Sequence, residues 1–599
     1  MSERKRSEIP VSQQWDVQSV YATAADWEAD FARIPALLKP VVDMRGKLTS
    51  AAAVAEVFRA EDELGIVMNR IYLYAHMLED SDLTVGENQA RMGRVRSQYA
   101  KIGGELAFIR PEILGQPEAT LRAWATEPTL APYKRSMMEL LREKPHTLSV
   151  QEETLLGLAG DIFSTARESF GKLTNADMKY DDATDSEGNK HTVTSGSFYS
   201  LLQKSDRALR QSAFEQIYKE YGEHSNTLAT MLGGSSKVHV FNANVRKFPG
   251  ALEASLFNDN IPPAVYHSLI SAVHEALPAF HEYLDLRARQ LGLEGDLNMW
   301  DMHVPIVPDF HLEVGWDECR EWVETSTKPL GADYHRTVLS SFAERWYDIY
   351  ENKGKRSGAY STGAFGQKPF MLLNYHDTLN DVFTVAHELG HSMHSWQSQH
   401  TQQYRYSDYP IFLAEIASTT NEALLHHHLM ETKDDPQLRA YLLNHLCDSF
   451  KGTLFRQTMF AEFELEIHRR LEKGETLTAE SVNEYYYELN AKYHGPRMKA
   501  DPKIAIEWMR IPHFYYNFYV YKYATGFAAA QIFAQQILSG DAGREKYLGF
   551  LRSGSSKDPL DTVRDAGVDL ANPEALQRAF ATFRAAVKEL SELLQPANA

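Results

Sequence analysis

Apolar residues recur at steps of three and four along most of the chain, which is the period of an amphipathic helix. One such stripe is formed by Leu64, Val67, Met68, Ile71, Ala75 and Leu78. The same period runs through residues 200–221, 265–291, 412–429 and 576–594. No repeat of fixed length accompanies these stretches, so a solenoid is not expected. The pattern predicts a mainly α protein.

Two stretches have the pattern of β-strands. Residues 179–194 contain a turn at Gly188 and Asn189, which predicts a small hairpin. Residues 369–375 are a short apolar run that follows a glycine-rich stretch, residues 351–367. The four glycines of that stretch predict backbone that is mobile or approaches a neighbour closely. We therefore expect β-structure only in small elements.

A polar, turn-rich segment, residues 181–196, is the best candidate for a boundary between domains. We place this boundary near residue 195. The prediction is an N-terminal helical domain with a small hairpin region, residues 1–195, and a larger C-terminal domain, residues 196–599, which holds the motif described below.

Composition and charge exclude several classes of protein. The chain has 599 residues, of which 43% are hydrophobic and 24% charged, and this is the composition of a folded, soluble protein rather than a disordered one. Its net charge of −19 repels phosphate backbones and anionic lipid surfaces, so we expect neither nucleic acid nor membrane as a partner. The longest apolar stretch, residues 523–538, is interrupted by polar residues and is too short to span a bilayer.

Cysteine usage indicates the compartment. The two cysteines, Cys319 and Cys447, cannot form a disulfide framework and neither lies in a C-x-x-C pair. The N-terminus is charged and has no apolar stretch behind it, which differs from a secretory signal. We expect a cytoplasmic protein.

Residues 387–391 have the pattern H-E-x-x-H, in which His387 and His391 are four residues apart and point to the same side of a helix. Thr378 and Asp381 form a predicted capping box upstream, so the motif lies well inside a helix. The alternative is a pair of hydrogen-bonded core histidines. Because buried polar groups are costly without partners, we favour a pair that binds a zinc ion, with Glu388 beside it.

The third ligand has two candidates, His394 and Glu415. No cysteine is near this helix in sequence, which favours an open catalytic zinc site over a closed structural one. His394 shares the face of His387 but lies about 10 Å further along the axis, too far to bind the same ion. We therefore favour Glu415, on the next predicted helix, and expect His394 to line the cleft or to hydrogen-bond to a ligand.

Glu422 lies seven residues after Glu415 and shares its helical face. Metal-bound imidazoles usually donate their second N–H group to a carboxylate or carbonyl, and Glu422 is a candidate for that acceptor. The alternative is an exposed helix charge.

A family resemblance rests on several segments of the chain: residues 358–361 (GAYS), 369–375, 387–394 (HELGHSMH) and 412–422 (FLAEIASTTNE), together with 15–21 and 205–210. With these segments the chain resembles the M3 family of metallopeptidases, and within it the oligoendopeptidase F group. The resemblance implies a mainly α, two-lobed protein with a deep central channel and a small β element near the active site. It also implies one zinc ion held by His387, His391 and Glu415, with Glu388 as the catalytic base.

Residues 512–526 contain five tyrosines and a histidine. Peptide hydrolysis generates an oxyanion, which prepositioned O–H or N–H donors stabilise. The resemblance implies that a His and Tyr pair from this segment does so, but the spacing departs from the thimet-type pattern. We expect the donors among His513, Tyr516 and Tyr523, with Tyr519 next, and place the three tyrosines on one helical face. An aromatic core stripe is the alternative for some of them.

These observations predict a zinc-dependent endopeptidase that hydrolyses internal bonds of short oligopeptides. We expect zinc to activate a water molecule and Glu388 to take its proton. Residues 369–375 could bind the substrate backbone as an added strand. A helical zinc metallocarboxypeptidase is the alternative, because it uses the same motif with a downstream Glu. A peptide-binding protein without activity is not favoured, since the base and the ligands are all present. We expect a monomer.

Overall fold

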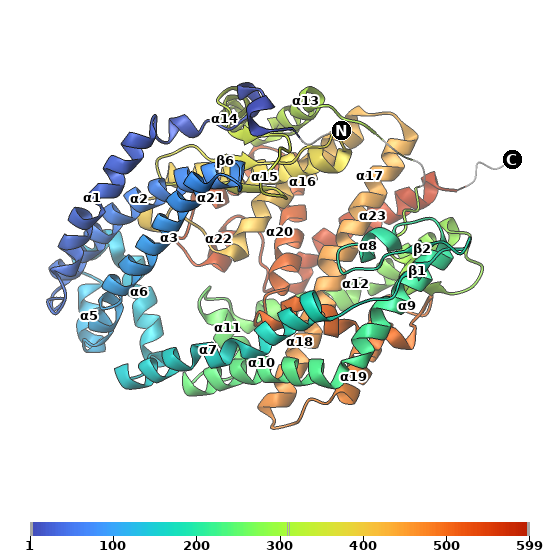
Figure 1. The fold of residues 1–599 in the computed structure, drawn as a ribbon, viewed down its shortest axis with the longest axis horizontal. Helices are drawn as coiled ribbons and strands as arrows, with labels where there is room; N and C mark the ends of the chain where they lie inside the picture. Colours follow the sequence, from blue (N-terminus) through green and yellow to red (C-terminus); the bar gives the residue numbers. More distant parts are fainter. Residues whose placement is uncertain (1–3, 308–309, 311, 596–599) are drawn as a thin grey trace. The chain divides into compact units, whose positions relative to one another are not determined.

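The computed structural model describes residues 4–307, 310 and 312–595, and helices make up most of its ribbon (Figure 1). The mainly α class predicted from the sequence is confirmed. By its internal contacts the chain forms two compact units. The first unit consists of residues 1–147, 312–429 and 533–567, and the second of residues 148–311, 430–532 and 568–599.

The predicted boundary near residue 195 lies inside the second unit rather than at a junction between the units. Each unit is assembled from three separate stretches of chain, an arrangement that a linear division at one residue cannot describe. The division into residues 1–195 and 196–599 stays a prediction, as does the deep channel that the resemblance implies.

The helices of the first unit are α1 (Ala24–Val42), α2 (Ala51–Ser81), α3 (Gly86–Leu106), α4 (Ile109–Leu114), α5 (Glu118–Trp124), α6 (Lys134–Glu143), α13 (Trp316–Ser326), α14 (Ala332–Ala343), α15 (Leu379–Gln399), α16 (Ile411–Thr432), α21 (Asp541–Arg552) and α22 (Pro559–Asp565). The long helix α2 packs against α1 and α3. Trp27 and Ile71 belong to their common core, which also takes in Phe370 and Leu372. This core therefore anchors the small sheet of the first unit to the helices.

The sheet of the first unit has three strands, β4 (Tyr347–Asp348), β5 (Tyr360–Thr362) and β6 (Phe370–Leu372), in the order β4-β6-β5. The strand predicted within residues 369–375 is thus confirmed as β6. It pairs in parallel with β4 and antiparallel with β5, with Ser361 opposite Met371. The expectation that β6 binds substrate as an added strand is wrong, because both of its edges are already paired.

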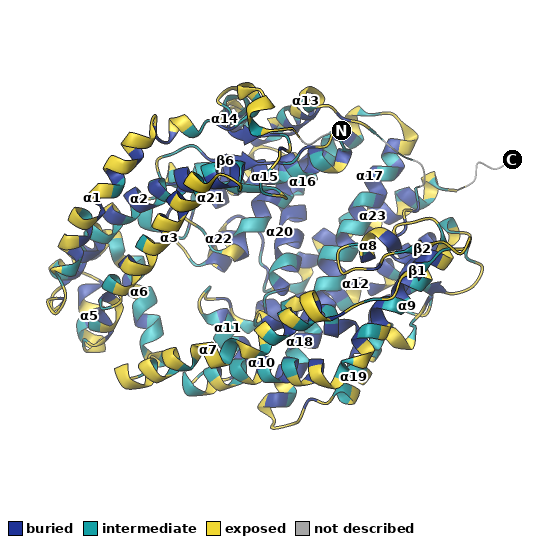
Figure 2. Cartoon of the chain, in the orientation of Figure 1, coloured by how far each residue is buried: buried dark blue, intermediate teal, exposed yellow. Residues whose placement is uncertain are grey.

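The helices of the second unit are α7 (Val150–Lys172), α8 (Phe198–Leu202), α9 (Arg207–Glu223), α10 (Ser225–Val245), α11 (Ala251–Phe257), α12 (Pro263–Gln290), α17 (Pro436–Ser449), α18 (Arg456–Glu472), α19 (Ala479–His494) and α23 (Pro573–Leu593). Helix α12 packs against α18, α19 and α23, and most of its length is buried. The chain passes from the second unit to the first within α20 (Tyr521–Leu538), which is dark blue along most of its length in Figure 2.

Strands of the second unit are short. The hairpin predicted in residues 179–194 is confirmed as β1 (Ala183–Thr184) and β2 (Lys190–His191), antiparallel around Gly188, whose φ is +90°. A second pair, β3 (Leu297–Asn298) and β7 (Met498–Lys499), is parallel. Among the described residues, no helix is both long and apolar enough to cross a membrane.

Candidate active site

Helix α15 carries the H-E-x-x-H motif and begins at the predicted capping box. The Asp381 N–H donates to the Thr378 hydroxyl at 3.2 Å, and the Asp381 carboxylate accepts from the Thr378 N–H at 3.1 Å. The apolar positions predicted to be buried in this helix are all buried: Val382, Phe383, Val385, Ala386, Leu389 and Met393. The motif is therefore held on a fully packed helix, which fixes the direction of its side chains.

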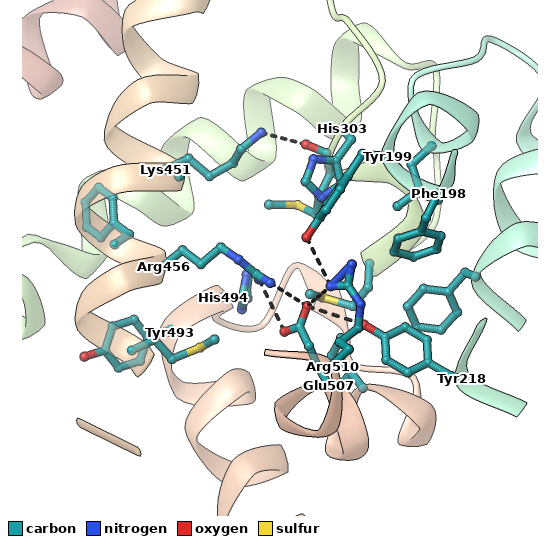
Figure 3. Close-up of a pocket in the computed structure, with 18 of the residues that line it drawn as sticks. Phe198, Tyr199, Tyr218, His303, Lys451, Arg456, Tyr493, His494, Glu507 and Arg510 are labelled. Atoms are coloured by element: carbon teal, nitrogen blue, oxygen red, sulfur yellow. Dashed lines mark hydrogen bonds and ion pairs between the residues drawn. The ribbon is translucent and has the colours of Figure 1, made fainter. Parts of the chain in front are cut away.

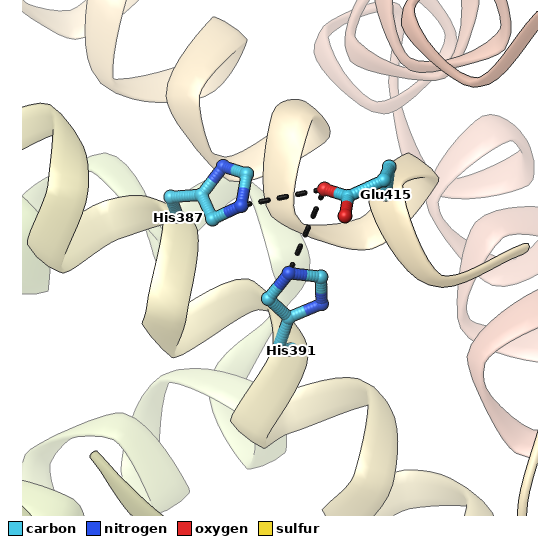
Figure 4. A group of neighbouring side chains, drawn as sticks. All are labelled: His387, His391 and Glu415. Carbon is cyan, nitrogen blue, oxygen red and sulfur yellow. Dashed lines mark ion pairs between the residues drawn. The ribbon is translucent and has the colours of Figure 1, made fainter. Parts of the chain in front are cut away.

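The structure brings His387, His391 and Glu415 together (Figure 4). Oε2 of Glu415 lies 3.4 Å from Nε2 of His387 and 3.6 Å from Nε2 of His391. One possible ligand atom from each residue lies within 4.8 Å of the other two. Ligands bound at about 2.1 Å to one tetrahedral ion are separated by about 3.4 Å, so these side chains fit a single metal ion.

A glycine allows the ligand-bearing helices to approach each other. A Cβ atom on Gly390 would lie 2.5 Å from Cα of Ser418 and 2.6 Å from the carbonyl oxygen of Ala417. Helices α15 and α16 are therefore in backbone contact next to the motif. This contact places Glu415, three residues before Ser418, opposite the two histidines.

Glu422 holds the ring of His387 in place. Nδ1 of His387 lies 2.5 Å from Oε1 of Glu422, which accepts its hydrogen bond and leaves Nε2 turned towards Glu415. The side chain of Glu422 is half-buried, so the alternative of an exposed helix charge is wrong. This is the arrangement of a metal-binding imidazole that is oriented by a carboxylate.

The pKa values of the two histidines are shifted in opposite directions. Burial acts to lower the pKa of His387, but the hydrogen bonds to Glu415 and Glu422 outweigh it and raise the pKa to about 10. Burial, together with the charge of His387, lowers the pKa of His391 to about 4. The hydrogen bond from His387 lowers the pKa of Glu415 to about 2 despite burial. The two carboxylates thus stabilise positive charge at His387, as expected of a site that binds a cation.

Glu388 is buried and lies in the same cavity as the three candidate ligands. Among the described residues, its Oε2 atom has no hydrogen-bond partner, while the backbone of Ser361 hydrogen-bonds to its carboxylate. Burial and the charge of Glu415 raise its pKa to about 7, against the opposing charge of His387. A carboxylate whose pKa is close to neutral is suited to take up and release a proton during catalysis.

The candidate site opens into a cavity of about 1040 Å³ within the first unit. Its wall includes residues 359–365, from the glycine-rich stretch that was predicted to approach a neighbour closely. Helices α2 and α3 contribute further residues, among them Asp62, Asn69 and Tyr99. These were missed in the sequence, because they lie about 300 residues before the motif and have no spacing that links them to it.

His394 does not take the role expected of it. It is fully buried, and among the described residues neither of its ring nitrogens has a hydrogen-bond partner. Its ring stacks on Tyr409 with the centroids 3.5 Å apart. His394 is therefore a packing residue and does not hydrogen-bond to a ligand.

The second unit brings together the four residues proposed as oxyanion donors: His513, Tyr516, Tyr519 and Tyr523. The centroid of the His513 ring is 5.7 Å from Tyr516, 6.3 Å from Tyr519 and 6.0 Å from Tyr523. Tyr516 is 46% exposed, so it does not belong to a core stripe. The catalytic role of these four residues stays a prediction.

The expectation that these tyrosines share one helical face is wrong. Asn517 and Phe518 both have positive φ, 51° and 57°, and α20 begins only at Tyr521. The Phe518 N–H donates to Oε1 of the buried Glu464 at 2.5 Å, and the Ser255 hydroxyl donates to the Asn517 carbonyl at 2.7 Å. A bend at residues 516–518 held by these contacts, rather than a continuous helix, brings the rings together.

Comparison with known proteins identifies the family. The model for peptidase family M3 matches residues 200–582, and the model for oligopeptidase F matches residues 112–180. The chain belongs to peptidase family M3. It is 39% identical to oligopeptidase PepF of Bacillus subtilis over 98% of this chain and 88% of that protein. It is also 39% identical to the plasmid-encoded oligoendopeptidase F of Lactococcus lactis subsp. cremoris over 99% of both chains.

Two solved structures agree with this assignment. A crystal structure of a protein from Chlamydophila abortus superimposes with a TM-score of 0.94 at 34% identity, covering 99% of this chain and 100% of the other. The oligoendopeptidase-F from Enterococcus faecium superimposes with a TM-score of 0.71 at 34% identity, covering 95% and 99%. The protein is therefore a peptidase, and its family is one of metallopeptidases.

Proposed function

We propose that this M3 peptidase is a zinc-dependent endopeptidase that cleaves internal bonds of short oligopeptides. The observation that carries the proposal is the convergence of His387, His391 and Glu415 in the cavity that also contains Glu388. The names of the relatives, oligopeptidase and oligoendopeptidase F, support the substrate class.

The donor set supports zinc as the metal. Two imidazole nitrogens and one carboxylate oxygen are the ligands of an open catalytic zinc site, which leaves a position for water. Zinc held by these three residues would supply Lewis-acid catalysis and lower the pKa of a water molecule. Glu422 would keep Nε2 of His387 directed at the ion.

Glu388 is proposed to transfer the protons of the reaction. Its unpartnered Oε2 atom can accept a proton from the attacking water and then donate it to the amine of the leaving fragment. The buried position of the carboxylate keeps bulk water from competing for that proton. The hydrogen bond from the Ser361 backbone holds the carboxylate in one orientation while it does so.

The substrate backbone is proposed to pair with β5. In the three-stranded sheet β5 has β6 on one side only, and no strand of the described residues lies beside its other edge. Residues 360–362 line the cavity, and Ser361 contacts the proposed base. An extended peptide added to this edge would gain main-chain hydrogen bonds that do not depend on its sequence.

His513, Tyr516, Tyr519 and Tyr523 are proposed as the source of donors to the oxyanion. The contact between their rings and the exposure of Tyr516 support a role outside the core. Which of the hydroxyls acts is decided by replacing each tyrosine with phenylalanine and comparing kcat at saturating substrate.

A metallocarboxypeptidase is the alternative, and the products distinguish the two activities. The protein is incubated with a pool of oligopeptides, with and without a chelator, and the fragments are identified by mass spectrometry. Internal cuts that chelation abolishes and zinc restores are expected. Release of single C-terminal residues alone would establish the carboxypeptidase instead.

We also propose that the protein acts as a monomer in the cytoplasm. Cys319 and Cys447 are both buried and free, which supports a reducing compartment. Size-exclusion chromatography with light scattering tests the oligomeric state, with a mass near 68.1 kDa expected.

A further inference from the structure

The second unit contains a cavity that the proposed peptidase reaction does not use (Figure 3). Its volume is about 70 Å³, and its lining includes side chains from α8, α9, α12, α18 and α19. We call it the Arg510 cavity. Its wall is largely aromatic and apolar, yet Lys451, Arg456, Arg510 and Glu507 also line it.

Positive charge exceeds negative charge around this cavity. Three cations, Lys451, Arg456 and Arg510, line the cavity with one carboxylate, Glu507. Just outside the lining, Asp448 forms ion pairs with Lys451 and with Arg287. These residues comprise four cations and two carboxylates. Arg287 is fully buried, and the side chains of Lys451 and Arg510 are only 13% and 10% exposed. Unbalanced charges in such surroundings are costly unless an anion compensates them.

Arg510 lies farthest from its carboxylate partner among these cations. Arg456 contacts both oxygens of Glu507, the nearer at 2.7 Å, whereas the nearest approach of Arg510 to that carboxylate is 3.7 Å. The hydrogen bond from Arg510 is donated to the Tyr199 hydroxyl at 3.1 Å. Its guanidinium group lies over the ring of Phe198 at 4.8 Å, which holds its plane fixed beside the cavity.

Other titratable groups respond to the same excess of positive charge. Burial and the charges of Arg287 and Arg456 lower the pKa of Lys451 to about 8, although Asp448 opposes them. Burial, with the charge of Lys451 next, holds the pKa of His303 well below its ordinary value. His303 therefore lines the cavity as a neutral imidazole that can donate one hydrogen bond.

We propose that the Arg510 cavity binds a small monoanion, a halide or a short carboxylate such as formate, against the guanidinium groups of Arg510 and Arg456. About 10–15 Å³ of such space holds one water molecule, so a cavity of about 70 Å³ has room for a small anion. The two ligand types share one chemistry, a single negative charge on a compact group.

The site also has a consequence for the neighbouring segment. Glu507 and Arg510 end the short helix Pro502–Arg510, and His513 follows three residues later. A second cavity of about 400 Å³ is lined by Arg456 and Arg510 and also by His513. An anion that fixes Arg510 thus fixes the start of the aromatic segment. The binding site itself does not depend on the catalytic role proposed for that segment.

Thermal denaturation tests the site in the full-length protein. Sodium chloride or sodium formate is increased at constant ionic strength, with a bulky sulfonate salt as the balancing electrolyte. The wild type is expected to show a saturable rise in Tm of several degrees with either anion, since ligand binding to the folded state stabilises it. Arg510→Gln should lose this response, and the control Arg469→Gln, on the exposed side of α18, should keep it. Identical responses in wild type and Arg510→Gln would overturn the proposal.

Wild-type crystals soaked in sodium bromide provide a test that needs no variant. An anomalous peak beside Arg510 is expected. Density for water alone, with no anomalous signal, would overturn the assignment. If Arg510→Gln does not fold, Tyr199→Phe removes the hydroxyl that orients Arg510, and it should weaken the anion-dependent rise in Tm several-fold.

Discussion

Nδ1 of His387 lies 2.5 Å from Oε1 of Glu422, so the candidate metal ligand is oriented by a residue 35 positions further along the chain. The hydrogen bond fixes both the tautomer and the plane of the imidazole, because only one ring nitrogen can then face Glu415. The ligand geometry consequently depends on a residue that would not touch the metal.

Replacing Glu422 should weaken metal binding without removing a ligand. We expect Glu422→Ala to lower the affinity for zinc about 10–100-fold, as for other carboxylates that orient a metal-bound histidine. Competition with a chromophoric chelator measures the effect. Glu431→Gln, an exposed change on the same helix, serves as the control, and equal affinities in both variants would contradict the role of Glu422.

Replacing Glu388 should separate metal binding from turnover. Glu388→Gln keeps the shape of the side chain but cannot take up a proton, so kcat is expected to fall about 10²–10⁴-fold while the zinc content is unchanged. Hydrolysis of a quenched fluorescent peptide and metal analysis give the two values. Near-normal turnover in the zinc-loaded variant would exclude Glu388 as the base.

Variants of the two candidates for the third ligand should differ in whether they retain zinc. Glu415→Ala removes the oxygen that lies within 3.6 Å of both histidine nitrogens, and it should lose zinc during dialysis. His394→Phe preserves the stacking on Tyr409 and should retain one zinc ion per chain. The reverse pattern in metal analysis would reassign the ligand.

Gly390 should be intolerant of even one added carbon. Because a Cβ atom there would meet the backbone of Ser418 at 2.5 Å, Gly390→Ala must push α16 away from α15. We expect weaker zinc binding and a lower Tm although all three donors remain. Gly93→Ala, in α3 where an added Cβ atom would meet nothing within 4 Å, controls for the gain in helix propensity. Unaltered zinc affinity in Gly390→Ala would show that the helix contact does not set the site.

Glu464 should make stability depend on pH. Burial raises its pKa from 4.5 to about 8, even though the Phe518 N–H favours the charged form. The folded state therefore binds this proton more tightly than the unfolded state, so its stabilising effect is complete below 4.5 and is lost as the pH rises through 8.

The variant Glu464→Gln can still accept the Phe518 N–H and cannot ionise. We expect its midpoint in urea, relative to that of the wild type, to increase between pH 5 and pH 8, because the unfolded wild type releases the Glu464 proton in this range while the folded wild type retains it. A constant difference between the two midpoints across that range would show that Glu464 does not titrate there.

The parts of the site that are close in sequence could be predicted. His387 and His391 are one helical turn apart, and any helix places such residues on one side. Their capping box and buried positions also follow from local pattern. Glu415 could be predicted only by assuming that a second helix supplies the third ligand, and the structure places this residue beside both histidines.

Features that depend on distant contacts could not be predicted. Strand order decides which edge of a sheet is open, and nothing in residues 369–375 shows that β6 lies between β4 and β5. The tyrosine segment has helical spacing, but Glu464, about 50 residues earlier, holds Phe518 in a left-handed conformation that breaks the helix. In both cases tertiary contacts outweigh local propensity.

The candidate ligands, the proposed base and Glu422 all belong to the first compact unit, whereas His513 and its neighbouring tyrosines belong to the second. The proposed metal binding and the proposed stabilisation of the oxyanion should therefore be lost independently of each other. Substitutions in the aromatic segment should give a protein that binds its metal fully but turns over slowly. Substitutions in α16 should give a protein that lacks the metal but keeps the aromatic segment intact.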